Sequence, residues 1–357
     1  MINWWRTNFG HKEIISLTNS VQNKNISQGK KTEELENKIA EILRVPYVVL
    51  CNSGSSSLLM SLMALNIKKG DEVIIPNRTW IATAHAILLS GAKPIIVDVE
   101  ADTPLMNLKK MAKKINKKTK AIMPVHLNGR YLDIGQINEI IDSKPIKIIE
   151  DACQAFLSKN EKKYIGTEGD IGCFSLGMTK LISSGQGGFA VTKDKTLYKK
   201  LKLIRNHGVV DQFTDNWNSV GFNFKYTDLQ ASVALTQLNR YKKIISNVRN
   251  IYSLYLKSIK NNGLIKIVPV SIEKGNLPLY VELLCKERSQ LTEYLAKRNI
   301  QVRPVPPSIN SSSYIESNPN LVNSVRFAMQ GLYLPCGPDQ NIKDVKYVIK
   351  ILNSFIN

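Results

Sequence analysis

The feature that most constrains the fold is a regular alternation of short apolar runs and helix-like stretches over residues 47–151. The apolar runs are YVVLC, DEVIIP, KPIIVDV, KAIMPVH and IKIIED. Stretches such as SSSLLMSLMAL and IGQINEIID separate these runs. Strands that alternate with helices predict a mostly parallel sheet that helices cover on both faces. A helix is also expected before the first strand, in TEELENKIAEIL, with Thr32 as its N-cap.

The pattern changes after about residue 227. The long helical stretch TDLQASVALTQLNRYKKII leads into LYVELLC, RSQLTEYLAKR and IQVRPV, which alternate strand-like and helix-like patterns. We therefore expect a large α/β domain over residues 1–240 and a small C-terminal α+β domain over residues 241–357.

The 357-residue chain has a formal charge of +20, but its lysines are spread along the whole length with acidic residues between them. The sequence has no basic–aromatic module, so we predict no nucleic-acid partner, and the positive field favours small anionic ligands. Five scattered cysteines without a CxxC pair argue against a disulfide framework or a zinc site, so no metal is expected. The sequence lacks an apolar run of about 18 residues and a signal-peptide core, which predicts a cytoplasmic protein with no membrane segment.

In open α/β sheets, ligands bind beyond the carboxyl ends of the strands. After YVVLC, the turn NSGSSS opens a helix, and its Gly54 and Ser55 are typical of an anion site at a helix start. Asp151 and Gln154 follow the strand IKIIE, and Trp80 follows the strand in DEVIIP. Simpler interpretations are a serine-capped turn for the first motif, a helix cap for Asp151 and a core position for Trp80.

The stretch GDIGCFSLGMTKLISSGQGGFAV places Lys180 in a polar, glycine-rich turn between two apolar strands. A lysine among apolar strands is poorly solvated, which favours the neutral amine that a Schiff base requires. If Phe174 and Leu176 enter the core, Ser175 faces the opposite way, toward the same pocket as the lysine. Pyridoxal 5′-phosphate needs an anion site for its phosphate, an acid for its ring nitrogen, an amine for its aldehyde and an aromatic side chain that stacks on its ring. The candidate residues together fit this cofactor.

The order of these motifs resembles the DegT/DnrJ/EryC1/StrS family of pyridoxal-phosphate-dependent sugar aminotransferases, which have fold type I. The resemblance covers nearly the whole chain. The segments that carry it are NSGSSSLLMSLMAL, GDEVIIPNRTWIATAHAI, GAKPIIVDV, AIMPVHLNG, IIEDACQAF, GTEGDIGCFSLGMTK, SSGQGGFAV, RNHG and GFNFKYTDLQASVALTQL. It implies a large, mostly parallel sheet of the seven-stranded type within a cofactor-binding domain.

By this resemblance, Lys180 forms the Schiff base with the cofactor and moves protons during catalysis. Asp151 is implied to pair with the ring nitrogen, and Gln154 to contact the ring hydroxyl. The other implied cofactor contacts are the backbone amides of Gly54 and Ser55, the hydroxyl of Ser175, the stacking ring of Trp80, and Asn223 from a neighbouring subunit. The resemblance therefore also implies a homodimer whose active sites are shared between subunits.

The implied reaction moves an amino group from a donor, L-glutamate in the family, to a keto acceptor. The cofactor alternates with pyridoxamine 5′-phosphate, and the acceptor is implied to be a nucleotide-linked keto-deoxysugar used in surface-polysaccharide or glycan biosynthesis. Alternatives are the same chemistry on a smaller non-sugar or phosphorylated ketone, a sugar dehydratase, and a non-catalytic cofactor-binding regulator. Lys180 argues against the dehydratase, in which a histidine replaces this lysine.

Five residues are candidates for contacts to the substrate, namely Arg78, His126, Lys225, Arg303 and Tyr314. For Arg78, an exposed surface arginine is an equal alternative. For His126, a structural role is the favoured alternative. The segment PPSINSSSY lacks the histidine of the family's pattern, which leaves recognition of the acceptor open.

Overall fold

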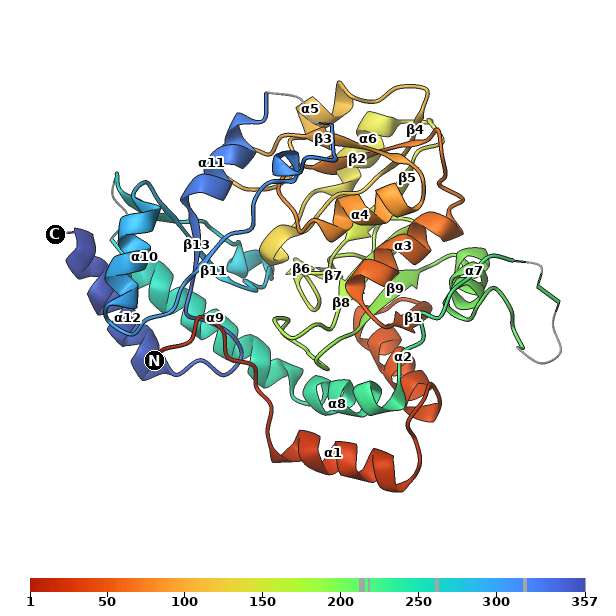
Figure 1. Ribbon diagram of the computed structural model, residues 1–357, viewed down its shortest axis with the longest axis horizontal. Coiled ribbons are helices and arrows are strands. Elements are labelled where there is room, and N and C mark those ends of the chain that lie inside the picture. The colour runs from red at the N-terminus through yellow and green to blue at the C-terminus, as the bar shows by residue number, and fades with distance from the viewer. Residues whose placement is uncertain (212–215, 218, 261–262, 317–319, 357) are drawn as a thin grey trace.

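The computed structural model describes residues 1–211, 216–217, 219–260, 263–316 and 320–356. Its centre is a seven-stranded sheet flanked by helices (Figure 1). In spatial order the strands are β1 (Tyr47–Cys51), β9 (Gly188–Thr192), β8 (Ile171–Ser175), β5 (Lys147–Asp151), β4 (Thr119–Ile122), β2 (Glu72–Pro76) and β3 (Lys93–Val97). Neighbouring strands are parallel, except that β9 runs antiparallel to both β1 and β8. The predicted large, mostly parallel sheet is confirmed.

Alternate side chains of the strands pack in separate hydrophobic layers on the two faces of the sheet. In β1, Val49 and Cys51 join one buried cluster, whereas Val48 and Leu50 join another. The helices of the first face are α3 (Gly54–Ala64), α4 (Ala82–Leu89) and α7 (Lys195–Arg205). Those of the second face are α2 (Lys30–Leu43), α5 (Leu108–Ala112), α6 (Ile134–Ile141) and α8 (Asp228–Leu238).

The start of α2 differs from the sequence prediction. The helix begins at Lys30 with Gly29 as its N-cap, so Thr32 lies inside the first turn. The carboxylate of Asp228 in α8 accepts hydrogen bonds from the backbone N–H groups of Gly29, Lys31 and Thr32 at 2.9, 3.1 and 2.8 Å. The first turn of α2 is therefore capped by a side chain almost 200 residues away in the sequence, and not by Thr32 as predicted.

The remainder of the chain builds a smaller lobe beside the sheet (Figure 1). It contains α9 (Tyr241–Ser258), α10 (Arg288–Ala296), α11 (Val322–Gln330), α12 (Ile342–Ile356) and an antiparallel sheet of β10 (Ile265–Ile267), β11 (Val281–Cys285), β13 (Gly331–Leu334) and β12 (Arg303–Pro304). The first residues of the chain also join this lobe, because Ile2 pairs with Ile300 and Trp5 with Cys336. The chain then crosses to α1 (His11–Gln22), which packs on α8. The domain boundary at residue 240 stays a prediction.

The remaining short elements of the described residues are the hairpin of β6 (Lys159–Asn160) with β7 (Lys163–Tyr164), and 3₁₀ turns at Leu127–Gly129, Ile272–Lys274 and Ile309–Ser311. Of the helices in the described part of the chain, none has the length and apolar character of a membrane span.

Candidate active site

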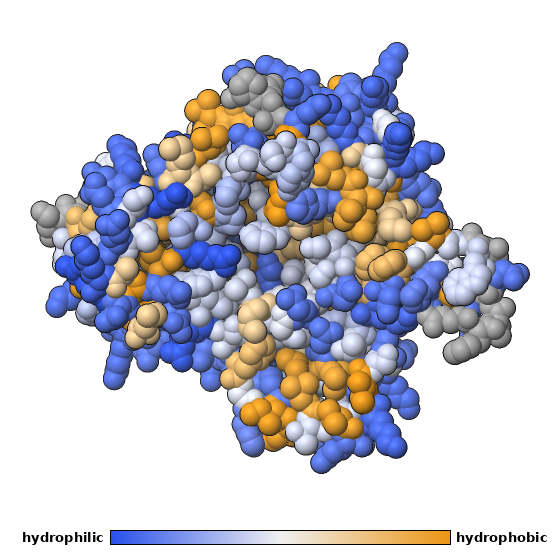
Figure 2. Space-filling view, viewed as in Figure 1, coloured by the Kyte–Doolittle hydropathy of each residue, from blue (hydrophilic) through white to orange (hydrophobic). Residues whose placement is uncertain are grey.

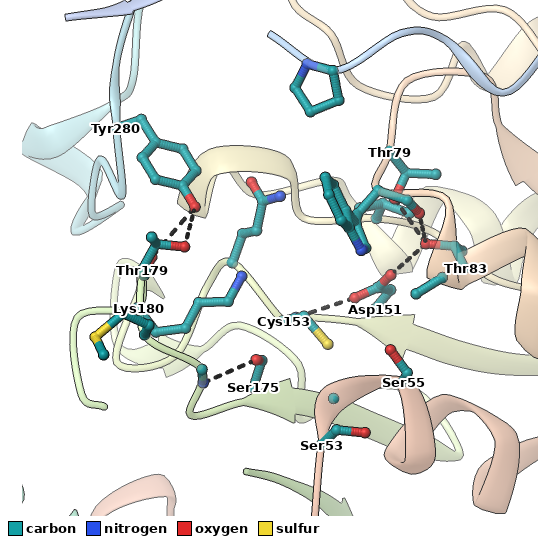
Figure 3. A pocket seen from close by; sticks show the side chains of 18 of the residues that line it. Ser53, Ser55, Thr79, Thr83, Asp151, Cys153, Ser175, Thr179, Lys180 and Tyr280 are labelled. Carbon is teal, nitrogen blue, oxygen red and sulfur yellow. Dashed lines mark hydrogen bonds between the residues drawn. The ribbon is translucent and has the colours of Figure 1, made fainter. Parts of the chain in front are cut away.

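A cavity of about 380 Å³ lies at the carboxyl ends of the strands of the large sheet (Figure 3). Its sheet side is formed by residues that end or follow β1, β2, β5 and β8, including Gly54, Ser55, Asp151, Ser175 and Lys180. Its lobe side is formed by Trp4, Tyr280, Arg303 and Tyr333. The cavity therefore occupies the position at which open α/β sheets bind ligands.

Lys180 lies in the turn between β8 and β9, and its side chain extends along the cavity (Figure 3). Backbone hydrogen bonds from Leu176 to Gly187 and from Ser184 to Leu176 close this turn. Gly187 has φ +146°, and a Cβ there would lie 2.5 Å from the ring of Tyr226, so the return into β9 needs glycine. The predicted pair of strands around a glycine-rich turn is confirmed.

Side chains alternate in β8 as predicted. Phe174 and Leu176 are buried in the core, whereas Ser175 lines the cavity. Gly54 packs directly against this serine, and a Cβ on Gly54 would lie 2.9 Å from both Cys153 Sγ and Ser175 Cβ. Glycine at the start of α3 thus lets the helix end approach β8 closely.

The start of α3 presents unpaired amides to the cavity. The hydroxyl of Ser53 accepts a hydrogen bond from the N–H of Ser56 at 3.0 Å and so caps the helix. Among the described residues, the N–H groups of Gly54 and Ser55 have no acceptor. Free amides and the positive end of the helix dipole together favour an anion here.

Asp151 ends β5 and is only 4% exposed. The hydroxyl of Thr83 donates to Oδ2 at 2.8 Å, and the N–H of Cys153 donates to Oδ1 at 3.2 Å. Thr79 Oγ1 lies 2.8 Å from Thr83 Oγ1, so Thr79 can donate to Thr83 while Thr83 donates to the carboxylate. This arrangement presents Asp151 as a hydrogen-bond acceptor in a buried position.

Gln154 and Trp80 are the other two residues predicted for the sheet side, and both line the cavity. Gln154 Oε1 accepts a hydrogen bond from the N–H of Asn128 at 2.9 Å, which leaves its Nε2 as the donor for the cavity. Trp80 lines the cavity with 52% of its surface exposed. The side chain is therefore not in the core, although a core position was the simpler interpretation.

His126 is buried beneath the site and does not line the cavity. Its Nδ1 accepts from the N–H of Leu132 at 3.2 Å, so Nε2 carries the proton and donates to Glu150 Oε2 at 2.8 Å. Burial alone raises the pKa of Glu150, but the hydrogen bond from His126 and those from backbone N–H groups outweigh it and hold this pKa below its usual value. Both ring nitrogens of His126 are engaged within the protein, as its structural alternative requires.

Arg78 is also buried, at 2% exposure, so the expectation of an exposed surface arginine is wrong. It follows β2, and its Nη1 donates to the carbonyl of Pro306 at 2.6 Å. Arg78 thereby ties the large sheet to the small lobe. It is not part of the cavity lining.

Tyr314 lies away from the cavity, contrary to its predicted contact with the substrate. Its hydroxyl is 2.7 Å from Nε2 of His85 in α4, and 59% of the residue is exposed. The reason is the path of the chain, which runs over α4 and brings Tyr314 beside Lys93 at the amino end of β3. The amino ends of parallel strands face away from the cavity.

Arg303 does line the cavity, and its guanidinium carbon lies 4.9 Å from the centre of the Trp4 ring. Asn223 is exposed and lies outside the lining of this chain's cavity. Its Oδ1 accepts from the N–H of Lys225 at 3.3 Å. Burial, together with the charge of Arg205, lowers the pKa of Lys225, which also lies outside the lining.

Sequence reasoning missed the aromatic residues of the lobe side and Thr83. The signal for Thr83 was its place three residues after Trp80, one helical turn into the segment that follows β2. Trp4, Tyr280 and Tyr333 come from distant parts of the chain, and no local pattern connects them. In the described residues, no group of three His, Cys, Asp or Glu side chains can hold a metal ion, and all five cysteines are free.

The family model of the DegT/DnrJ/EryC1/StrS aminotransferase family matches residues 8–353. A GDP-perosamine synthase of Escherichia coli O157:H7 is 36% identical over 334 residues, which cover 92% of this chain and 91% of the relative. A second GDP-perosamine synthase, from Caulobacter vibrioides, is 30% identical and covers 92% of this chain and 91% of its own.

Solved structures agree with this match. DesV of S. venezuelae superposes with a TM-score of 0.91 at 26% identity, covering 96% of this chain and 94% of its own. A DegT/DnrJ/EryC1/StrS aminotransferase of Brucella abortus has a TM-score of 0.90 at 25% identity, covering 96% and 95%. The chain therefore belongs to the DegT/DnrJ/EryC1/StrS aminotransferase family and is a pyridoxal-phosphate-dependent aminotransferase.

Proposed function

We propose that Lys180 and Asp151 carry the chemistry of this aminotransferase and that the sheet side of the cavity holds pyridoxal 5′-phosphate. The donor set fits this cofactor: an amine for its aldehyde, a buried carboxylate for its ring nitrogen and a helix start for its phosphate. The single observation that carries the proposal is that one cavity of about 380 Å³ brings Lys180, Asp151 and the free amides of Gly54 and Ser55 together.

Each residue has a separate task in this proposal. Asp151 keeps the ring nitrogen protonated, and Thr83 orients its carboxylate. The Nε2 of Gln154 donates to the ring hydroxyl, the hydroxyl of Ser175 adds to the phosphate cradle, and Trp80 covers the ring. When bound, the cofactor acts as an electron sink for the carbon that loses its proton. Lys180 Nζ takes that proton from the α-carbon of the amino donor and later returns one.

The proposed amino donor is L-glutamate, and the proposed acceptor is a GDP-linked keto-deoxysugar whose amination gives GDP-perosamine. The similarity to GDP-perosamine synthases over more than nine-tenths of the chain supports this choice. Arg303 supplies a cation on the lobe side that suits an anionic substrate. UDP- and dTDP-linked sugars are the competing acceptors, because transaminases for such sugars are also similar, at 28% and 29% identity.

The test starts from purified protein reconstituted with pyridoxal 5′-phosphate. We expect a yellow protein whose visible absorption is lost when L-glutamate is added. After removal of glutamate, the GDP-linked 4-keto-6-deoxysugar should restore the colour and yield the amino sugar by mass spectrometry. Restoration only by UDP- or dTDP-linked ketones, or by a small phosphorylated ketone, would contradict the proposed acceptor.

The same experiment separates the other interpretations. A product that has lost a sugar hydroxyl instead of gaining nitrogen would indicate a dehydratase. A protein that stays colourless after reconstitution, or binds the cofactor but ignores every donor, would indicate a regulator.

We further propose that the chain works as a homodimer in which Asn223 reaches the phosphate of the partner's cofactor. Asn223 is exposed and outside its own cavity. In addition, α1 turns Glu13, Ser16 and Ser20 toward the protein and leaves an apolar face toward solvent, visible at the bottom of Figure 2. That face consists of Ile14, Ile15, Leu17 and Val21, which are 60, 47, 37 and 55% exposed.

Sedimentation measurements test this proposal. Wild-type protein and the Asn223→Ala variant are both expected to sediment as dimers, with faster loss of cofactor from the variant. An Ile14→Lys, Val21→Lys double variant is expected to sediment as a monomer. Monomeric wild-type protein, or unchanged cofactor retention in Asn223→Ala, would contradict the arrangement.

A further inference from the structure

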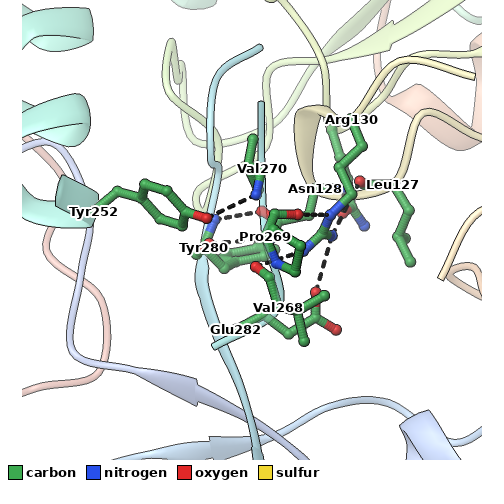
Figure 4. Close-up of polar contacts among 10 residues, drawn as sticks. Leu127, Asn128, Arg130, Tyr252, Val268, Pro269, Val270, Tyr280 and Glu282 are labelled. Atoms are coloured by element: carbon green, nitrogen blue, oxygen red, sulfur yellow. Dashed lines mark hydrogen bonds and ion pairs between the residues drawn. The ribbon is translucent and has the colours of Figure 1, made fainter. Parts of the chain in front are cut away.

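The seam between the large sheet and the small lobe contains a pair of hydrogen bonds that resembles a strand pairing (Figure 4). The side chain of Asn128 donates through Nδ2 to the carbonyl of Tyr280 at 3.0 Å, and its Oδ1 accepts from the N–H of Tyr280 at 2.6 Å. Asn128 is 1% exposed and has φ +56°, a left-handed conformation that asparagine tolerates better than most residues. One buried side chain therefore fixes the backbone of Tyr280 to the large sheet.

Asn128 also holds a residue of the cavity. Its backbone N–H donates to Gln154 Oε1 at 2.9 Å, which sets the orientation of the Gln154 amide. Since Oε1 is engaged in this way, Nε2 is the group presented to a ligand. The same residue thus positions Gln154 on one side and Tyr280 on the other.

Tyr280 extends this connection to the turn that carries Lys180 (Figure 3). Its hydroxyl lies 3.2 Å from Thr179 Oγ1 and 3.3 Å from the carbonyl of Thr179, the residue before Lys180. Rings of Trp4, Trp5 and Tyr333 surround the Tyr280 ring, with centroid distances of 6.0, 5.5 and 4.5 Å. The hydroxyl is therefore held in place from both ends of the residue.

The seam around this pair is tightly built. A Cβ on Gly129 would lie 1.8 Å from the carbonyl oxygen of Leu277, so the two backbones are in direct contact. Arg130 donates to the carbonyls of Pro269 and Val268 and forms a buried ion pair with Glu282 at 3.0 Å. These contacts leave little freedom for the strand that begins after Tyr280 to move relative to the large sheet.

We propose that Asn128 and Tyr280 are positioning residues that connect the Gln154 side of the cavity to the Lys180 turn through the small lobe. This inference rests on the proposed function only for its catalytic consequence. The structural part, that Tyr280 orders the turn, holds for the cofactor-free protein as well.

The chain offers a matched control at the same seam. The hydroxyl of Tyr252 accepts a hydrogen bond from the N–H of Val270 at 2.7 Å, and Tyr252 is buried (Figure 4). Tyr252 is not among the residues that line the cavity. Tyr280→Phe and Tyr252→Phe each remove one hydrogen-bonded hydroxyl from this region. Only the first removal should affect the turn.

Hydrogen exchange of the cofactor-free protein is the first test. In Tyr280→Phe, the peptide spanning residues 176–187 should exchange about three- to tenfold faster than in wild type, the change expected from one lost hydrogen bond. Tyr252→Phe should leave that peptide unchanged. Asn128→Asp, which keeps the left-handed backbone but turns an acceptor toward the carbonyl of Tyr280 in a buried position, should give at least as large an increase.

The loaded enzyme supplies the second test. Tyr280→Phe should lower kcat about tenfold with little change in KM for glutamate, because misplacing a catalytic group affects the chemical step. It should also shift the pH midpoint of the visible absorption of the lysine-bound cofactor. Equal turn exchange in Tyr280→Phe and wild type, or equal effects of the two Phe variants, would overturn the proposal. A chain in which Lys180 proved not to bind the cofactor would still show the exchange difference, so the two failures are distinguishable.

Discussion

The sheet side and the lobe side of the cavity are built by different rules. On the sheet side, each residue lies at or just after the carboxyl end of a strand of one sheet: Asp151 and Ser175 end β5 and β8, and Gly54, Ser55 and Lys180 lie in the segments that follow β1 and β8. Trp4, Tyr280, Arg303 and Tyr333 are brought together by tertiary packing between the start of the chain and an antiparallel sheet. A parallel sheet gathers the ends of its strands at one edge, so it concentrates functional groups in a way that the sequence reveals.

The difference between the two sides of the cavity suggests that each side has a separate function. The sheet side supplies an amine, a buried carboxylate and a helix start with free amides, which are groups that suit a fixed cofactor. The lobe side supplies aromatic surface and one arginine, which suit recognition of a variable substrate. Substitutions on the sheet side should therefore abolish chemistry, whereas those on the lobe side should alter binding and rate more modestly.

The largest effect is expected for Lys180→Ala. Removal of the only proposed proton carrier should lower transamination by about a thousandfold or more. The variant should still bind the cofactor without a covalent bond, and its melting temperature should stay close to that of wild type. Activity within tenfold of wild type would show that another group moves the proton.

Glu150→Gln tests the support beneath the sheet side. Glu150 accepts hydrogen bonds from His126 Nε2 and from three backbone N–H groups, and the amide of Gln would leave at least one of these buried donors unpaired. The variant should therefore lose about 1.5–3 kcal/mol and unfold at clearly lower denaturant concentration at pH 7. Because the folded protein lowers the pKa of Glu150, its ionised form stabilises the fold above the ordinary carboxyl pKa of about 4, and this stability is lost as pH falls further. The free energy of unfolding of the variant should consequently fall less steeply with acid than that of wild type. The same pH dependence of the free energy of unfolding in the variant and in wild type would contradict an ionised, hydrogen-bonded Glu150.

Asp151→Asn keeps the shape of the side chain and removes its charge. Because the ring nitrogen would lose its anionic partner, we expect the rate to fall about a hundredfold, within the range seen for loss of one electrostatic contact in an active site. Thr83→Val removes only the hydroxyl that orients Asp151, so its rate should lie between those of Asp151→Asn and wild type. The measurement is single-turnover conversion of the bound cofactor by glutamate. Equal rates in wild type and Asp151→Asn would remove Asp151 from the mechanism.

The smallest effects on kinetics are expected for Arg303→Ala and Tyr314→Phe, which are compared as a pair. Arg303 lines the cavity, so its removal should raise KM for the anionic acceptor about tenfold, with a smaller change in kcat. The hydroxyl of Tyr314 contacts His85 outside the cavity, so Tyr314→Phe should change KM by less than about twofold. Steady-state kinetics with the same acceptor compare the two. A larger effect of Tyr314→Phe would show that its segment moves to the substrate.

The sheet and the segments of the sheet side could be predicted because local patterns encode them. Apolar runs separated by helices predicted the strands around Asp151, and the glycines after Lys180 predicted the turn before β9. The cap of α2 could not be predicted, because Asp228 reaches it from almost 200 residues away. Tyr280 and Trp4 could not be predicted as cavity residues, because segments far apart in the sequence bring them there. The prediction for Tyr314 was wrong because the path of a loop depends on packing rather than on its own sequence.

Peptide mapping after borohydride reduction tests the central claim most directly. The reconstituted protein is reduced, digested and analysed by mass spectrometry for a peptide that carries the cofactor. The account predicts one modified peptide, with the pyridoxyl group on Lys180. A modified peptide containing any other lysine, with Lys180 unmodified, would contradict it.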